Sequence, residues 1–450
     1  MKHNITFSVI AAAALASCTQ NEDFTSQYNE KAKTMKFDVA YVGKNTRAAT
    51  GDLDTEGLAN QKLILWCDAY QTPTAPETTP SNGMWISTQE PLYLSKSYAT
   101  TYWNVYSNSD ASTEVEVSYP GSTYTTYFTA IAPQDEFEAA TTGEGTATKA
   151  TYSMAGQLTT ENQSNAPSFG SRLLTLNNIP VVQQVVNGDS PQGIDYLITC
   201  AKSTSEEVSL QFKHLLSKLR FAVWTDENTM ATAGSETTKI ELNYLKVYLP
   251  KDKTAKYVQD AHNDVAGTWT WNDYTAPTES NPTALTDYQE YTLYYEGTGT
   301  PEPKDVKYYA GPTTAHNANN WDNVKLDPNF FIAPTGESTN AKIYIDIKYT
   351  VRRKVGSNWS TTNEQSTGEG VVYSAGHKVV ERTKMLVPIS DTAHGTDTDN
   401  DADHNEGLSH FHQGFIETLY ICLRADQKVT FSSNFTVDGW VEDPIYGKQL

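Results

Sequence analysis

The chain has 450 residues, enough for two or three domains, and a formal net charge of -21 at pH 7. This charge argues against nucleic acid as a partner, because phosphates are bound by basic surfaces. It suits a surface protein whose copies repel one another. The chain contains 27 tyrosines, and Ser, Thr and Asn are frequent throughout, a composition that favours strands and loops over long helices.

The N-terminus has the features of an export signal. Lys2 and His3 give a short basic start, and residues 5–16 form an apolar run that is too short to cross a bilayer as a helix. The run ends in the motif L-A-S-C, which matches a bacterial lipobox and places the lipid on the thiol of Cys18. We therefore predict a lipoprotein signal peptide at residues 1–17; the alternative is an ordinary signal peptide with a chance cysteine. No later segment is apolar enough to span a membrane, so anchoring would depend on lipid alone.

The next element is a predicted strand at residues 35–42, where apolar and polar side chains alternate. Residues 45–50 follow it as a polar segment of small residues with one arginine, Arg47. Segments of this kind are accessible to proteases.

Short alternating runs recur along the rest of the chain, and no long amphipathic helix is found. The clearest run is 208–214, where a period of two places Val208, Leu210 and Phe212 on one face. Further runs lie at 219–223, 240–249, 343–349, 418–423 and 429–440. Many short strands with frequent turns predict an all-β fold of β-sandwich domains rather than a parallel α/β sheet. The stretch 199–207, about midway, is the best candidate for a domain boundary.

Three cysteines remain beyond Cys18, and each lies in an apolar, strand-like run: Cys67, Cys200 and Cys422. We expect buried thiols. An oxidising compartment would allow one disulfide but not a disulfide framework.

Several segments, in this order along the chain, resemble the fimbrillin family. Residues 212–221 (F-K-H-L-L-S-K-L-R-F) resemble the family pattern F-x-H-x-L-S-K-L-x-F. A D-Y-L segment that begins at residue 195 precedes this pattern, as a similar segment does in the family. Residues 102–104 and 127–133 are similar to the family's Y-W-P … F-x-A-x-x-P segment, with asparagine where proline is usual. Residues 431–440 resemble the closing strand and its terminal tryptophan.

The resemblance implies a type V pilin of a Gram-negative surface fimbria, exported as an outer-membrane lipoprotein precursor. It implies two tandem β-sandwich domains of transthyretin-like, Greek-key type, at residues 48–205 and 206–450, after a propeptide at residues 18–47. An Arg-specific protease would remove the propeptide by cutting between Arg47 and Ala48. The alternative is that Arg47 is an ordinary loop cation.

The implied assembly is strand addition. Loss of the propeptide strand would leave an apolar groove, which a strand of a neighbouring subunit fills. The expected partners are other fimbrial subunits and, for an adhesive fimbria, a host or bacterial surface receptor or glycan. The tail after Trp440 is interrupted by Pro444 and Gly447, so it is a poor independent donor strand. This favours a tip or minor subunit over a stalk subunit.

Two clusters could bind metal ions. Residues 397–403 place carboxylates at every second position, as calcium loops do, but Ala402 and Leu408 stand where an EF-hand needs Gly and Glu. A solvated acidic loop is the better interpretation. Four histidines lie nearby without the spacing of a structural zinc site: His394, His404, His410 and His412. No metal site and no cofactor is predicted.

Enzyme signatures such as G-x-S-x-G, H-E-x-x-H and the P-loop are absent from the sequence, so no catalytic residue is predicted, and His214 is interpreted as structural. Two alternatives stay open. One is a glycan-degrading enzyme with a carboxylate pair. The other is a surface lipoprotein that does not polymerise and binds glycans through exposed aromatic residues such as Trp269, Trp271, Tyr274, Trp321 and Trp359. Aromatic faces do stack on sugars, yet core packing explains most aromatic residues in a β-sandwich.

Overall fold

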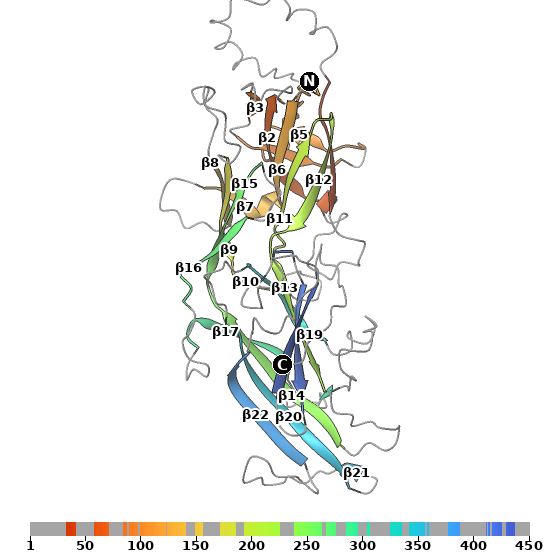
Figure 1. The fold of residues 1–450 in the computed structure, drawn as a ribbon, viewed down its shortest axis with the longest axis vertical. Helices are drawn as coiled ribbons and strands as arrows, with labels where there is room; N and C mark the ends of the chain where they lie inside the picture. Colours follow the sequence, from red (N-terminus) through yellow and green to blue (C-terminus); the bar gives the residue numbers. More distant parts are fainter. Residues whose placement is uncertain are drawn as a thin grey trace, which may run out of the picture.

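The fold is given by a computed structural model. It describes residues 33–41, 58–71, 84–87, 90–97, 100–122, 124–140, 149–155, 172–185, 193–225, 238–262, 267–275, 285–295, 304–306, 325–334, 342–355, 358–359, 377–387, 411, 413–414, 416–424 and 429–436. Apart from a helical turn at residues 58–59 and a short 3-10 turn at Gln134–Glu136, the regular structure of these residues is β, which confirms the all-β prediction. Figure 1 shows an elongated molecule with β1 to β6 towards one end and β14, β20 and β22 at the other.

The first sheet, sheet A, has the strand order β1-β12-β11-β6-β2-β4-β5, and β3 also pairs with β2. Its strands are β1 (Lys36–Tyr41), β2 (Lys62–Gln71), β3 (Met84–Ser87), β4 (Leu92–Ser95), β5 (Asn104–Tyr106), β6 (Tyr124–Ala132), β11 (Leu197–Ser203) and β12 (Glu207–His214). The pairing of β1 with β12 is parallel, and the other pairings in this sheet are antiparallel.

Sheet B has the order β16-β15-β9-β8-β7 and packs against one face of sheet A. Its strands are β7 (Phe137–Ala139), β8 (Ala150–Ala155), β9 (Leu173–Pro180), β15 (Thr254–Asp260) and β16 (Thr268–Asn272). The ring of Trp66 in β2 meets the ring of Tyr152 in β8 edge to face, with centroids 5.4 Å apart. Such aromatic contacts stabilise a fold by more than the burial of their surface area alone.

The other end of the molecule contains sheets C and D (Figure 1). Sheet C has the order β10-β19-β13-β23-β24, with β10 (Val182–Val185), β13 (Ser217–Trp224), β19 (Lys325–Ile332), β23 (Ile416–Leu423) and β24 (Val429–Thr436). Sheet D has the order β17-β14-β20-β21, with β18 on β14 and β22 on β20. Its strands are β14 (Thr238–Pro250), β17 (Tyr288–Tyr295), β18 (Lys304–Asp305), β20 (Tyr344–Val355), β21 (Asn358–Trp359) and β22 (His377–Leu386).

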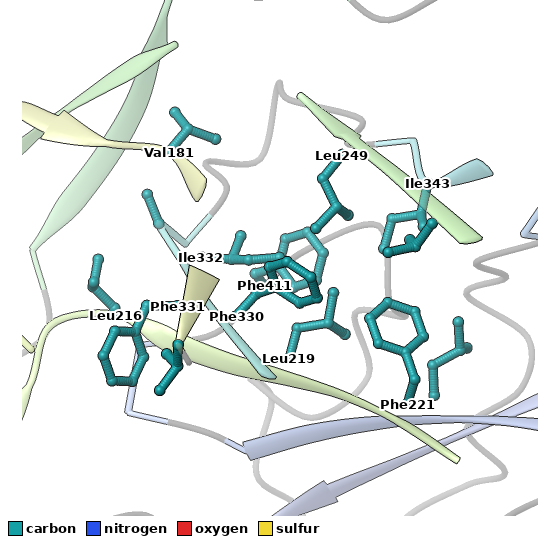
Figure 2. Packing of buried hydrophobic residues seen from close by; sticks show 14 of the residues in the cluster. Val181, Leu216, Leu219, Phe221, Leu249, Phe330, Phe331, Ile332, Ile343 and Phe411 are labelled. Carbon is teal, nitrogen blue, oxygen red and sulfur yellow. The ribbon is translucent and has the colours of Figure 1, made fainter. Parts of the chain in front are cut away.

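One apolar core runs from sheets A and B into sheets C and D. Figure 2 shows the part where the chain passes between them, around Leu216, Phe331 and Phe411. The rings of Phe221 in β13 and Phe330 in β19 meet edge to face, with centroids 6.1 Å apart. Removal of this apolar area from water is the main favourable term for the fold.

The strands form where the sequence alternates. In β12, buried and exposed residues alternate along the whole strand, and Val208, Leu210 and Phe212 are all buried. The predicted runs at 219–223, 240–249, 343–349, 418–423 and 429–440 contribute to β13, β14, β20, β23 and β24. His214 ends β12 inside the protein, with its Nδ1 atom 2.7 Å from Oδ1 of Asp195, as a structural histidine would be.

Strand pairing crosses the predicted domain boundary between residues 205 and 206. β11 pairs with β12, β9 pairs with β15, and β10 pairs with β19, so that three of the four sheets combine residues from both sides of this position. The division into domains at residue 205 stays a prediction.

The predicted burial of the thiols is confirmed for two of them. Cys67 and Cys422 are buried, and Cys200 is half-buried, with its Sγ atom accepting a hydrogen bond of 3.1 Å from Nε2 of Gln259. Burial, together with the neighbouring Asp68 carboxylate, raises the pKa of the Cys67 thiol well above its ordinary value. Such a thiol packs as a small apolar group and is unreactive.

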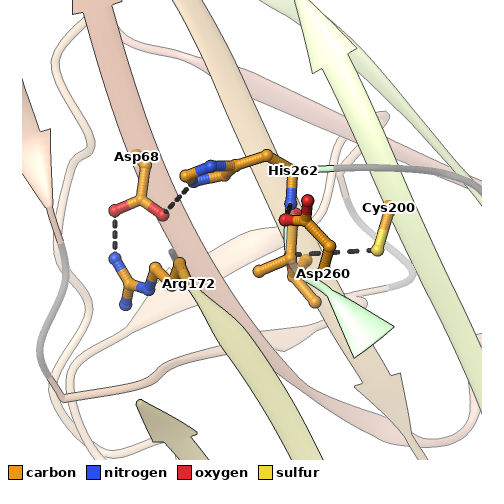
Figure 3. A network of polar contacts seen from close by, with 7 residues as sticks. Asp68, Arg172, Cys200, Asp260 and His262 are labelled. Atoms are coloured by element: carbon orange, nitrogen blue, oxygen red, sulfur yellow. Dashed lines mark hydrogen bonds and ion pairs between the residues drawn. The ribbon is translucent and has the colours of Figure 1, made fainter. Parts of the chain in front are cut away.

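A buried polar network connects sheets A and B. Figure 3 shows Asp68 of β2 between the guanidinium of Arg172, which precedes β9, and the imidazole of His262, which follows β15. Nε2 of His262 lies 3.0 Å from Oδ2 of Asp68, and Nη1 of Arg172 pairs with Oδ1. Thr129 of β6 donates a 2.6 Å hydrogen bond to the carbonyl oxygen of Ala261. The side chains of Asp68, Arg172 and His262 are nearly fully buried.

Substitution of Arg172 by Met should therefore destabilise the chain strongly, because the Asp68 carboxylate would lose its buried cation. We expect the free energy of unfolding to fall by about 3–5 kcal/mol. The double variant Arg172→Met with Asp68→Asn removes both charges and should lose less. Denaturant unfolding of the three proteins measures both differences, and equal losses for the single and double variants would contradict this account.

Candidate strand-exchange site

Strand β1 is hydrogen-bonded along both of its edges. On one side it runs parallel to β12, in register from Lys36 opposite Glu207 to Tyr41 opposite Phe212. On the other side, the amide of Trp103 donates to the carbonyl oxygen of Phe37 at 2.9 Å, and the amide of Met35 donates to Val117 at 2.8 Å. β1 is therefore enclosed by neighbours that are distant in sequence.

The inward face of β1 is apolar and buried. The exposed fractions of Met35, Phe37 and Val39 are 4%, 0% and 8%. Their cluster includes apolar side chains from β12, β6 and the segment that follows Tyr102. The ring of Phe37 meets the ring of Phe128 edge to face, with centroids 5.4 Å apart. Without β1, this cluster would be an open apolar groove along β12.

On its outward face, the β1 segment forms ion pairs with the residues at the start of β12. Nζ of Lys36 lies 3.5 Å from Oε1 of Glu207 and 3.7 Å from Oε1 of Glu206. The same lysine sits over the ring of Tyr102, 5.5 Å from its centroid, and Nζ of Lys33 lies 3.5 Å from Oε2 of Glu206. The hydroxyl of Tyr102 donates a 2.8 Å hydrogen bond to Oε1 of Glu207.

These contacts shift the pKa values of the groups involved. The hydrogen bond from Tyr102, and then the contacts with Lys36, lower the pKa of Glu207. Partial desolvation works against the charged form of Lys36, but its hydrogen bond to Glu207 and the charges of both glutamates raise its pKa overall. The pKa of the Tyr102 hydroxyl is raised, first by its hydrogen bond to Glu207. Each group is thus held in the protonation state that the cluster needs near neutral pH.

The predicted strand at 35–42 is confirmed as β1, and it belongs to the predicted propeptide at 18–47. The predicted site residues Cys18, Arg47 and Ala48 lie outside the described residues. The acidic segment 397–403, interpreted as a solvated loop, and the four histidines near it also lie outside them. The sequence did not indicate that Trp103 closes the second edge of β1. It also gave no signal that Lys36 meets Glu206 and Glu207, although the charges are opposite.

Two of the aromatic residues weighed for glycan binding are core residues, in line with the interpretation that core packing explains most aromatics in a β-sandwich. Trp269 and Trp271 of β16 are each 6% exposed and belong to the core. Nε1 of Trp271 donates a 2.9 Å hydrogen bond to the carbonyl oxygen of Pro334. Tyr274 is half-buried, and its hydroxyl lies 3.1 Å from that of Tyr288. Trp321 and the side chain of Trp359 are not among the described parts. Alternation with polar residues suits a buried strand face as well as a binding surface, so the sequence left both interpretations of the two tryptophans open.

In the described segments, no group of three or more His, Cys, Asp or Glu side chains could hold a metal ion. Among these segments there is also no helix with the length and apolar character needed to cross a membrane.

Comparison with known proteins gives weak similarity only. No family profile and no curated protein matches the sequence. Solved structures with similarity over most of their length include candidate cell adhesion proteins from Bacteroides uniformis (10% identity, 92% of this chain and 99% of that chain, TM-score 0.33) and Bacteroides ovatus (12% identity, 92% and 99%, TM-score 0.28). A candidate adhesin from Bacteroides thetaiotaomicron has 8% identity over 89% of this chain and 95% of its own, with a TM-score of 0.29. At such TM-scores the likeness is too loose to transfer a fold or a function.

The buried face of β1 should contribute strongly to stability. Replacement of Phe37 by Ala removes a fully buried ring from the cluster, and we expect the free energy of unfolding to fall by about 3–5 kcal/mol. The neighbouring residue Asp38 points outward and is exposed, so Asp38→Asn serves as the control and should change stability by less than about 0.5 kcal/mol. Denaturant unfolding compares the two variants. Similar small losses would mean that β1 is not a structural part of sheet A.

Proposed function

We propose that this chain is a structural subunit of a surface fimbria, in which a strand from a neighbouring subunit replaces β1. The observation that carries the proposal is the position of β1. This strand comes from the predicted propeptide, yet its apolar face is buried in the core and its backbone is bonded on both edges. A leader that serves export alone has no need of such contacts, whereas a leader that keeps a groove closed until delivery does.

The energetics support exchange rather than simple loss. Removal of β1 would expose apolar surface and unpaired backbone groups of β12, a combination that invites another strand. Burial of each large apolar side chain is worth about 1.5–3 kcal/mol. A strand with three of them therefore gains roughly 5–9 kcal/mol before the entropic cost of ordering it. The parallel pairing of β1 with β12 is slightly less stable per residue than an antiparallel one, which eases its release.

The assembly would be open-ended. A subunit that receives its neighbour's strand makes a head-to-tail contact, and such contacts propagate into a filament. In this proposal Cys18 delivers the precursor to the outer membrane, and cleavage between Arg47 and Ala48 releases the leader with its lipid. The mature subunit is then held at the cell surface by its neighbours, and the fimbria supports adhesion.

The two pairs of packed sheets correspond, in this proposal, to the two tandem β-sandwich domains of the transthyretin-like type. Sheets A and B form one, with β12, β15 and β16 contributed by residues beyond 205. Sheets C and D form the other. Each sheet buries one face against its partner, as a two-layer β fold requires.

The position proposed for this subunit is the tip, or that of a minor component. Among the described residues, the strand nearest the C-terminus is β24, and it pairs with β23 at every position from Ile416 opposite Thr436 to Leu423 opposite Val429. Donation of β24 would break this ladder and uncover Leu419 and Ile421, which are buried. A tip subunit needs a groove but no donor strand.

Treatment of the precursor with an Arg-specific protease should give a stable product that starts at Ala48. N-terminal sequencing and intact mass measure the cut, and the Arg47→Ala variant is the control that should keep its leader. In the cut protein, amides of β12 should exchange hydrogen faster once β1 has left. A chain that resists the protease at Arg47 would rule out this route to the groove.

The processed protein alone should not form long filaments, because β24 is committed to its own sheet. Electron microscopy and light scattering after protease treatment measure this directly. A processed protein that stays monomeric agrees with the tip assignment. Long filaments from the purified chain would show that it donates a strand and is a stalk subunit.

A further inference from the structure

The charged rim of the groove has a consequence for the strand that replaces β1. Glu206 and Glu207 belong to the receiving part of the chain, since Glu206 precedes β12 and Glu207 is its first residue, and Tyr102 lies just before β5. Their cationic partners, Lys33 and Lys36, belong to the β1 segment. When β1 leaves, both cations leave with it.

The rim that remains has the chemistry of a cation site. Two adjacent carboxylates and the face of a tyrosine ring are left without the ammonium groups that they contact in the closed protein. Carboxylates and aromatic faces both attract a cation, and two unneutralised carboxylates repel each other. The net charge of -21 for the chain adds to the attraction for a basic group.

We propose that this rim selects the incoming strand: the strand that takes the place of β1 carries a basic residue directly before the large apolar residue that fills the Phe37 position. The inference rests on the proposed function. The apolar pocket fixes the register of the strand, because a shift of one residue would turn the apolar side chains outward. Adjacent residues of a strand point to opposite faces, so the position before the Phe37 position faces the two glutamates.

The rule also tells which strands are poor occupants. In β24, the residues before Phe431 and Phe435 are Thr430 and Asn434, and neither is basic. A second copy of this chain that donated β24 in the direction of β1 would leave Glu206 and Glu207 without a cation. The matching partner is a different subunit, with an apolar–basic–aromatic sequence in its donor strand.

Peptide capture tests the rule. The full-length chain is cut with an Arg-specific protease in the presence of a fluorescent peptide, and retention of the peptide is measured by anisotropy and size-exclusion chromatography. The peptide with the sequence of residues 33–41, which contains no arginine for the protease to cut, should be captured. We expect roughly threefold to tenfold weaker capture for Lys36→Gln, since two exposed ion pairs are lost, and a larger loss for Lys36→Glu. The differences should shrink in high salt.

Two further comparisons place the effect on the rim. In the chain with Glu206→Gln and Glu207→Gln, the unchanged and Lys36→Gln peptides should bind alike. A peptide of residues 429–436 should bind better after Thr430→Lys. If the double-glutamine chain does not fold, the comparison of the unchanged, Lys36→Gln and Lys36→Glu peptides on the unchanged chain still tests whether the charge at position 36 matters.

The outcomes separate the two proposals. Equal capture of the unchanged and Lys36→Glu peptides would overturn selection by the rim and leave the groove intact. Failure to capture any peptide, or equal capture of a Phe37→Ser peptide, would overturn strand exchange itself and the inference with it. Capture that follows the charge at position 36 and needs Phe37 supports both.

Discussion

The insertion of Phe37 between β12 and the segment around Trp103 is the contact on which the architecture of sheet A depends. It closes an apolar cluster that would otherwise face water, and it satisfies backbone groups on both sides of β1. Because the strand lies in the predicted leader, the same contact defines what its removal would uncover. In the proposed function, this one interaction would both stabilise the precursor and, once broken, leave a place for another strand.

The two faces of β1 make different kinds of interaction. The inward face supplies burial, which is strong and tolerant of any apolar side chain of suitable size. The outward face supplies ion pairs between exposed groups, which contribute little energy but depend on the sign of the charge. Affinity for a strand would thus come from the groove, and discrimination between strands from its rim.

The rest of the molecule supports the strands of sheet A that surround β1. Sheet A is fixed to sheet B by the Asp68–Arg172–His262 network and by the aromatic contact of Trp66 with Tyr152. The apolar core continues into sheets C and D around Leu216 and Phe331. The proposed exchange would benefit from this support, because a preorganised binding surface loses less free energy to ordering when a strand binds.

The sequence by itself determined the strands. Alternation with a period of two predicted β1 and the buried face of β12, because each side chain's face follows from its place in the strand. It did not determine which strands lie side by side: the pairing of β9 with β15, the closure of β1 by Trp103 and the burial of Trp269 and Trp271 depend on contacts between residues far apart in the chain. The meeting of Lys36 with Glu206 and Glu207 was decided in the same way, since a charge in a sequence shows no partner until the tertiary structure brings one within reach.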